Sequence, residues 1–272
     1  MDHDAGNGTH RGTRGASGTP ERPAAGGRAV QAPGDGRARG DPARARAVAF
    51  DLGGVLIDWN PRYLYRRLFA GDDAAMERFL TEVCTPDWNA RLDAGASWDE
   101  AVDALSALHP DLRAMIEAYR DRWDEMLGGA FDDTVAVVRD LRSIGMPLYV
   151  LSNWALRTFA VTRGRYEFLD WFDGLVISGE VGVGKPDPAI FRHLLDRFGL
   201  EPASTVFIDD VARNVEAAQS LGMIGLVFTG AGQLRRDLAN LGVPVPDASG
   251  GVRRAVTRAA LPADGGPRAA AR

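Results

Sequence analysis

Four groups of polar residues in this sequence could do chemistry, and each lies at or near the end of a short apolar run. They are Asp51 after AVAF, Ser152 with Asn153 after LYVL, Lys185 in GVGKPDP, and Asp209 with Asp210 after TVFI. Three carboxylates and one ammonium group suit a divalent cation together with a phosphate. Mg²⁺ prefers oxygen ligands, keeps several waters, and takes one or two carboxylates plus substrate oxygens. These residue types therefore favour a Mg²⁺ site that binds a small phosphorylated compound.

The lysine of this set stands out within the composition. Lys185 is the only lysine in the chain, and arginine fills every other basic position among the 32 Lys and Arg residues. Lysine carries a compact charge on a flexible stem, whereas arginine presents a planar fork. We interpret Lys185 as a position that needs a point charge.

Two other kinds of site are disfavoured by local sequence. The stretch GEVGVGK, residues 179–185, matches the G-x-x-x-x-G-K part of a P-loop, but Pro186 follows where Ser or Thr should bind Mg²⁺. The stretch also comes late in the chain rather than after the first strand. Ser152 lacks the surrounding G-x-S-x-G of a hydrolase nucleophile. Neither a nucleoside triphosphatase nor a serine hydrolase is indicated.

The elements that must position these residues alternate between strands and helices, which predicts an α/β fold with a parallel sheet. Apolar runs predict strands at 48–50, 148–151, 175–178, 205–208 and 225–228, and helical periodicity predicts helices at 134–144, 187–198 and 211–221. Parallel strands end at the same edge of a sheet, where open α/β sheets bind ligands. The pair Gly53–Gly54 lets the backbone turn sharply after Asp51. We therefore expect the polar strand ends to converge on one site.

The chain divides by composition and periodicity. Residues 61–129 show helical periodicity without a convincing strand, which predicts an insertion of about four helices after the first strand. We expect the core to comprise 46–60 and 130–235. Residues 1–45 and 248–272 contain few large apolar side chains, so we expect disordered tails. The net charge is +3 over residues 1–46, +4 over 248–272, and −12 between them.

Composition also restricts cofactors and partners. Cys84 is the only cysteine, so neither an internal disulfide nor a Cys-rich metal site can form, and the four histidines supply little for zinc chemistry. The sequence contains no run of 18 apolar residues, so we expect no membrane span. Its first residues do not form the continuous apolar segment of a signal peptide, so we expect a cytoplasmic protein. The basic tails lack interleaved aromatic residues, so we expect no nucleic-acid partner. The oligomeric state stays open.

Four motifs in order, FDLGGVLID, VLSN, GKPDPAIF and VFIDDVARNVEAA, resemble those of the haloacid dehalogenase-like (HAD) hydrolase superfamily. Within it, the sequence looks most like the phosphatases with a DLGNV or DLGGV first motif, such as bacterial sugar-1-phosphatases. The resemblance covers about residues 47–230. It implies a Rossmann-like core with a helical cap, and Mg²⁺-dependent hydrolysis of a small phosphate monoester such as a sugar phosphate.

The resemblance also implies roles for single residues. Asp51 would be the nucleophile and form an aspartyl-phosphate, and Lys185 would neutralise charge between Asp51 and the phosphate. Ser152 and Asn153 would hold the oxygens of the transferring group. The implied Mg²⁺ ligands are the Asp51 carboxylate, the Gly53 carbonyl, and Asp209 and Asp210, directly or through water.

One position departs from the superfamily's usual pattern. Its phosphatases usually carry a second Asp two residues after the nucleophile as general acid and base, and here Gly53 stands there. We therefore expect a preference for esters with an acidic leaving oxygen, such as sugar 1-phosphates or aryl phosphates. Two alternatives stay open, a 2-haloacid dehalogenase-type hydrolase and a catalytically weak phosphate-binding regulatory protein. The candidates to line the substrate pocket are Trp59, Asn60, Arg62, Trp88 and Arg91.

Overall fold

Five parallel strands form the central sheet of the computed structural model, which describes residues 45–245. The sheet order is β5–β4–β1–β6–β7, with β1 at Ala47–Phe50, β4 at Leu148–Ser152, β5 at Gly174–Ile177, β6 at Thr205–Asp209 and β7 at Ile224–Val227. The predicted α/β fold is confirmed, and each predicted strand agrees with the structure to within one residue at either end. The predicted tails lie outside the described residues, apart from Ala45.

Strand β1 lies at the centre of the sheet and determines which residues meet at its edge. All four of its residues are buried, and it pairs with β4 on one side and β6 on the other. Phe50 is opposite Val150 and Ile208, and the Asp51 N–H continues the ladder by donating to the Ile208 carbonyl at 2.9 Å. The polar residues that follow β1 and β6 are therefore neighbours.

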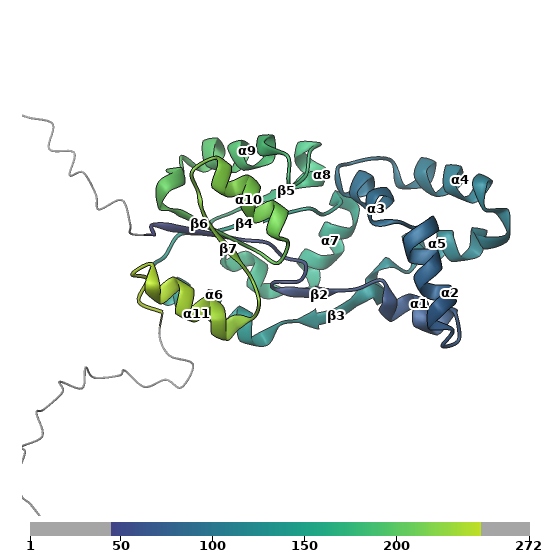
Figure 1. The fold of residues 1–272 in the computed structure, drawn as a ribbon, viewed down its shortest axis with the longest axis horizontal. Helices are drawn as coiled ribbons and strands as arrows, with labels where there is room; N and C mark the ends of the chain where they lie inside the picture. Colours follow the sequence, from purple (N-terminus) through teal and green to yellow (C-terminus); the bar gives the residue numbers. More distant parts are fainter. Residues whose placement is uncertain (1–44, 246–272) are drawn as a thin grey trace, which may run out of the picture. The chain divides into compact units, whose positions relative to one another are not determined.

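Helices cover both faces of the sheet. Figure 1 shows α9 (Pro188–Phe198) and α10 (Ala212–Ser220) on one face, and α6 (Asp132–Ser143) and α11 (Ala231–Asn240) on the other. The alternation of β1 fits these layers, because Ala49 packs in the cluster with α9, whereas Val48 and Phe50 pack in the cluster with α6 and α11. The predicted helices correspond to α6, α9 and α10. The sequence reading missed α11, α7 (Leu156–Arg165) and the short α8 (Ser178–Val181).

The predicted insertion of helices lies between β1 and α6. We call Arg62–Met126 the helical insertion. It comprises α1 (Arg62–Leu68), α2 (Asp73–Arg78), α3 (Pro86–Asp93), α4 (Trp98–Leu108) and α5 (Arg113–Asp121), a π-helical turn at Phe79–Val83, and 3₁₀ turns at Pro110–Leu112 and Trp123–Met126. Two antiparallel strands, β2 (Ile57–Trp59) and β3 (Leu127–Ala130), join it to the sheet layers. This strand pair was not predicted.

The helical insertion has an aromatic interior. The ring of Tyr119 lies 5.1 Å from that of Trp88 and 6.1 Å from that of Tyr65, measured between centroids. Thr85 and Ser97 cap the N-termini of α3 and α4, and their hydroxyls accept hydrogen bonds from backbone N–H groups in the first turn. These caps and the buried rings hold α3 in place.

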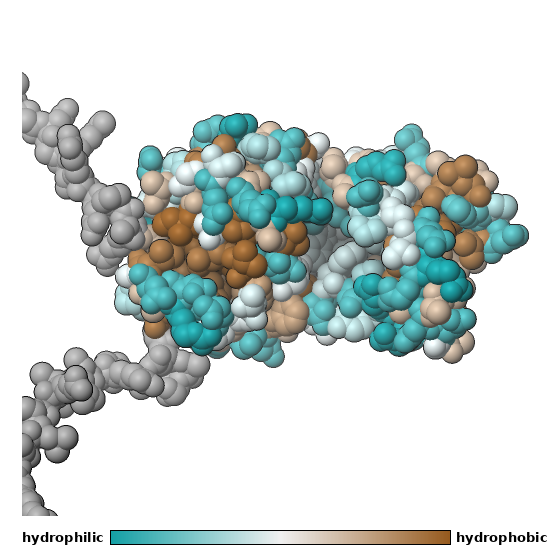
Figure 2. Space-filling view, viewed as in Figure 1, coloured by the Kyte–Doolittle hydropathy of each residue, from teal (hydrophilic) through white to brown (hydrophobic). Residues whose placement is uncertain are grey.

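The surface is mostly hydrophilic over the helices. Figure 2 shows a hydrophobic area over the edge strand β7, whose residues are only partly buried, with Val227 exposed by 44%. Within residues 45–245, no helix has the length and apolar character needed to cross a membrane.

Phe207 tests the assigned core, because its side chain is fully buried in β6 and packs edge-on against Phe191 of α9 at 5.2 Å between centroids. Phe207→Ala should lower the free energy of unfolding by about 3–5 kcal/mol, since it removes buried contacts and leaves a cavity. Leu108→Ala, at a side chain exposed by 75%, should change it by less than about 0.5 kcal/mol. Urea denaturation measures both values, and equal losses would contradict this core.

Candidate active site

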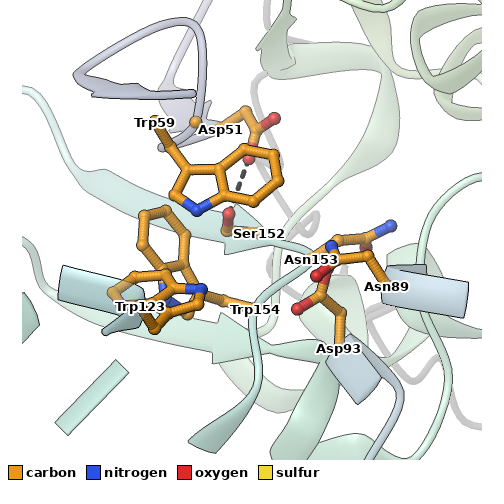
Figure 3. Close-up of a pocket in the computed structure, with 9 residues that line it drawn as sticks. Asp51, Trp59, Asn89, Asp93, Trp123, Ser152, Asn153 and Trp154 are labelled. Atoms are coloured by element: carbon orange, nitrogen blue, oxygen red, sulfur yellow. Dashed lines mark hydrogen bonds between the residues drawn. The ribbon is translucent and has the colours of Figure 1, made fainter. Parts of the chain in front are cut away.

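The structure brings four of the predicted residues into direct contact at the carboxyl edge of the sheet. The Ser152 hydroxyl, at the end of β4, donates to Asp51 Oδ1 at 2.7 Å (Figure 3). Lys185 Nζ lies 2.9 Å from Asp51 Oδ1 and 2.6 Å from Oδ2 of Asp209, the last residue of β6. The side chains of Lys185 and Asp209 are almost completely buried. The expected convergence of strand ends is therefore present.

Burial and charge oppose each other in this cluster. Burial alone would lower the pKa of Lys185, but the carboxylates of Asp51 and Asp209 together hold that pKa above its ordinary value. Burial raises the pKa of Asp51 to about 6, although Lys185 counteracts part of this effect. The ammonium group therefore stays charged at neutral pH and balances the negative charge of two carboxylates that are shielded from solvent.

Asp209 is held from several directions. Its Oδ1 accepts from the Val211 N–H at 2.8 Å, and the Nδ2 of Asn214 on α10 lies 3.1 Å from both of its oxygens. With the bond from Lys185, both oxygens of Asp209 have donors. This role of Asn214 was not predicted. Asn214 follows Asp209 and Asp210 by about one helical turn, and that spacing could have indicated a contact with them.

Asp51, Asp209 and Asp210 form a cluster that could hold a metal ion. Each offers a carboxylate oxygen, and these atoms all lie within 4.8 Å of one another. Partial burial and the charge of Asp209 raise the pKa of Asp210. Three acids around a single ammonium group leave excess negative charge in a set of oxygen donors, which fits Mg²⁺.

The turn after β1 is shaped to admit Asp210. Gly54 has φ +75°, a conformation that favours glycine, and a Cβ at this position would collide with the Asp210 carboxylate. The neighbouring Gly53 lies at the cavity described below. Glycine at position 54 is therefore needed both for the turn and for the approach of Asp210.

Asn153 makes contacts that its sequence position did not reveal. Its Oδ1 accepts from the Lys185 N–H at 2.7 Å, and its Nδ2 donates to the Lys185 carbonyl at 2.8 Å. This pair of hydrogen bonds fixes the loop that carries Lys185. Contact of Asn153 with a substrate stays a prediction.

A cavity of about 90 Å³ lies between these strand ends and the helical insertion (Figure 3). It is lined by Asp51, Gly53, Trp59, Asn89, Asp93, Trp123, Ser152, Asn153 and Trp154. The sequence reading missed Asn89, Asp93, Trp123 and Trp154. Asn89, Asp93 and Trp123 lie in the helical insertion, where polar and aromatic residues usually serve solubility or packing. Trp154 directly follows Ser152 and Asn153, and that position could have indicated it.

Of the five candidates for the pocket wall, Trp59 lines this cavity and the other four do not. The Asn60 side chain accepts from the Arg62 N–H at the start of α1, and the Arg62 guanidinium pairs with Glu77 at 2.5 Å. Trp88 packs against Tyr119 inside the helical insertion. The contacts of Asn60, Arg62 and Trp88 are thus local to the helices, and a role for any of the four residues in substrate binding stays a prediction.

Comparison with known proteins assigns the sequence to a family. Residues 45–222 match the sequence profile of the haloacid dehalogenase-like hydrolases. A phosphatase of Mycobacterium tuberculosis is 30% identical over 213 residues, which cover 72% of this chain and 94% of that protein. A sesquiterpene phosphatase of Aspergillus oryzae is 27% identical over 186 residues, covering 68% of this chain and 90% of that protein.

A solved structure shares the fold. The HAD family enzyme bt-2542 from Bacteroides thetaiotaomicron, solved in complex with magnesium and inorganic phosphate, superposes with a TM-score of 0.53 at 24% identity. The match covers 67% of this chain and 93% of that one.

Lys185→Met tests the charge balance of the cluster. It should lower the free energy of unfolding by about 3–5 kcal/mol at about pH 8, because two buried carboxylates lose the ammonium group between them. Without that cation, the folded-state pKa of Asp51 rises further above its ordinary value near 3.8. The folded state then holds protons that the unfolded chain has released, so the variant loses stability as the pH rises.

The deficit relative to wild type should therefore be smaller at about pH 5 than at about pH 8. Urea unfolding at both pH values, with EDTA present, measures it. A deficit that is the same at both would show that carboxylate repulsion does not dominate.

Proposed function

The chain belongs to the haloacid dehalogenase-like hydrolase family, and within it we propose that this protein is a Mg²⁺-dependent phosphatase that hydrolyses a small phosphate monoester. The observation that carries the proposal is the Asp51 carboxylate at the cavity wall, bonded to both Ser152 and Lys185. The similar proteins named phosphatases support it. The geometry is suited to covalent catalysis by Asp51.

Attack by a carboxylate divides hydrolysis into two displacements. In the first, a bond forms between Asp51 and phosphorus while the bond from phosphorus to the alcohol oxygen breaks. In the second, water displaces the aspartate and releases phosphate. The donors on Ser152 and Lys185 hold the carboxylate in the free protein, and both lie where oxygens of an arriving phosphoryl group would accumulate charge.

The carboxylate cluster would hold the metal. The Asp209 carboxylate already accepts hydrogen bonds from Val211, Asn214 and Lys185. The Asp210 carboxylate accepts a hydrogen bond from its own backbone N–H. We therefore propose that Asp210 binds directly, with Asp51 and the Gly53 carbonyl, while Asp209 acts directly or through water. Bound Mg²⁺ supplies charge that screens the substrate from these carboxylates.

We further propose that residues 61–129 act as a cap over a core of 46–60 and 130–235. The helical insertion contributes Asn89, Asp93 and Trp123 to the cavity, so it can exclude water and select the substrate. A cavity of about 90 Å³ suits a phosphoryl group with a small leaving group unless the cap opens.

The carboxylate cluster favours phosphoryl transfer over dehalogenation. A haloacid dehalogenase attacks carbon and has no phosphoryl charge to screen, so three clustered carboxylates would serve no purpose in it. A panel of phosphate monoesters assayed with and without Mg²⁺ identifies the substrate and separates an enzyme from a weak phosphate-binding protein.

Asp51→Asn should reduce kcat/KM on the best substrate of that panel by more than about a thousandfold, because it removes the nucleophile. Asp58→Asn is a matched control, since Asp58 is a partly buried carboxylate bonded to Tyr63 and does not line the cavity. It should stay within about twofold of wild type, by the general tolerance of positions away from the site. Residual activity of Asp51→Asn within about tenfold of wild type, measured by phosphate release, would exclude Asp51 as the nucleophile.

Removal of metal with EDTA should abolish activity, and Mg²⁺ should restore it. Mg²⁺ at about a hundredfold above its Kd should also stabilise the folded state by about 2.7 kcal/mol, which appears as a rise in Tm. Asp210→Asn should lose most of that rise. Full phosphatase activity in EDTA would contradict the proposed metal dependence.

A further inference from the structure

We propose that Asp93, at the end of α3 in the helical insertion, is the general acid and base of the reaction and replaces the carboxylate that Gly53 does not provide. The inference rests on the phosphatase function proposed above. It concerns a catalytic residue on the cap, far in sequence from the four motifs of the core.

Asp93 lies at the same cavity as the nucleophile. It is the last residue of α3, and both Asp93 and Asp51 line the cavity. Figure 3 shows Asp93 and Asn89 entering from one side, with the indoles of Trp123 and Trp154 on another and Asp51 beyond Ser152. A phosphate ester whose phosphorus lies beside Asp51 would therefore have its leaving oxygen in the cavity that Asp93 also lines.

The Asp93 side chain is held by groups from three elements. Asn89 Nδ2 donates to Asp93 Oδ2 at 2.7 Å, and the Tyr119 hydroxyl of α5 donates to Asn89 Oδ1 at 3.1 Å. The backbone N–H of Ala155, in the loop after β4, also bonds to the Asp93 carboxyl. This chain of bonds fixes both the amide of Asn89 and the direction of the carboxyl, which general acid catalysis requires.

The backbone of Asp93 is fixed as well. Ser178 Oγ donates to the Asp93 carbonyl at 2.6 Å and accepts from the Trp154 N–H at 2.9 Å. The end of α3 is thus attached to the segment that follows Ser152 and Asn153. The position of Asp93 relative to the nucleophile is set by hydrogen bonds rather than by side-chain freedom.

The surroundings also adjust the proton affinity of the carboxyl. Burial raises the pKa of Asp93 to about 7, opposed by the hydrogen bonds from Ala155 and Asn89. Two titratable groups face the Asp93 carboxyl. Asp51, across the cavity, raises the pKa of Asp93 slightly. Tyr119 lies behind Asn89, and burial raises the pKa of the Tyr119 hydroxyl. An acid with a pKa near neutrality can give a proton in one step and take one in the next.

The proton balance closes over the two displacements. In the first, Asp51 bonds to phosphorus, the leaving oxygen departs and takes the proton of the Asp93 carboxylic acid, and Asp93 becomes a carboxylate. In the second, Asp93 takes a proton from the attacking water as the bond from phosphorus to Asp51 breaks. Asp93 is then protonated again, and the products are the alcohol and phosphate.

The first test uses the wild-type enzyme and a series of phosphate monoesters of increasing leaving-group pKa. With Asp93 as the acid, kcat/KM should depend only weakly on leaving-group pKa, because the departing oxygen is protonated as it leaves. For alkyl esters it should decline as the pH rises through about 7, where Asp93 loses its proton. A steep dependence in wild type would overturn the proposal and support the sequence-based expectation from Gly53.

The second test is Asp93→Asn, which keeps the shape of the side chain and removes the proton. It should lower kcat/KM for a primary alkyl phosphate by about 10²- to 10⁴-fold, but for p-nitrophenyl phosphate by less than about tenfold, since that leaving group needs no proton. The decline of alkyl-ester activity near pH 7 should disappear. Asp87→Asn, the same change on the exposed side of α3, is the control and should leave both rates unchanged.

Equal losses on both esters would mean that Asp93 only positions the cap, and would overturn the proposal. If Asp93→Asn fails to fold, judged by circular dichroism, the wild-type series alone decides. Asp51→Asn should be inactive on both esters, so activity in that variant would refute the proposed function independently of Asp93.

Discussion

The ammonium group of Lys185, buried between the carboxylates of Asp51 and Asp209, is the interaction on which this site depends. Strands β1 and β6 are neighbours, so the fold itself forces the two carboxylates together at the sheet edge. Buried charges lose their hydration. Their mutual attraction offsets this loss only when the geometry is good and the remaining lone pairs and protons are hydrogen-bonded. Asn214 and Ser152 complete those bonds on the carboxylates, and Asn153 fixes the lysine backbone. Such a cluster is better explained by phosphate chemistry than by stability.

The core half of the site could be predicted from sequence because one rule governs it. Polar residues at the ends of parallel strands meet at one edge, so Asp51, Ser152 and Asp209 could be brought together without coordinates. The cavity wall obeys no such rule. Asn89 and Asp93 lie on a helix of mixed polarity, where a carboxylate facing a cavity cannot be told from one facing water. The strand pair β2–β3 was missed because its strands are short and β3 contains two glycines.

The prediction drawn from Gly53 stays a prediction, and the structure offers an alternative to it. The missing carboxylate at Gly53 implied a site without a general acid, because the comparison was confined to the residues beside the nucleophile. The structure supplies a carboxyl from Asp93, which is distant in the chain but lines the same cavity. In the proposed reaction, the core contributes charge for the phosphoryl group, and the helical insertion contributes aromatic surface and the proton for the leaving group. Substrate choice and proton transfer would both depend on the placement of the insertion.

The two glycines after Asp51 differ in how well they would tolerate a side chain. A side chain at position 54 would have to adopt a left-handed backbone and displace Asp210. A Cβ at position 53 would meet only the rim of the Trp154 ring, at 3.9 Å, an ordinary contact distance. Space therefore does not forbid a side chain at position 53, whereas at position 54 a side chain would be strained and would displace the Asp210 carboxylate. An acid could thus be introduced at the first position without disturbing the turn, whereas a substitution at the second would disturb both the turn and a proposed metal ligand.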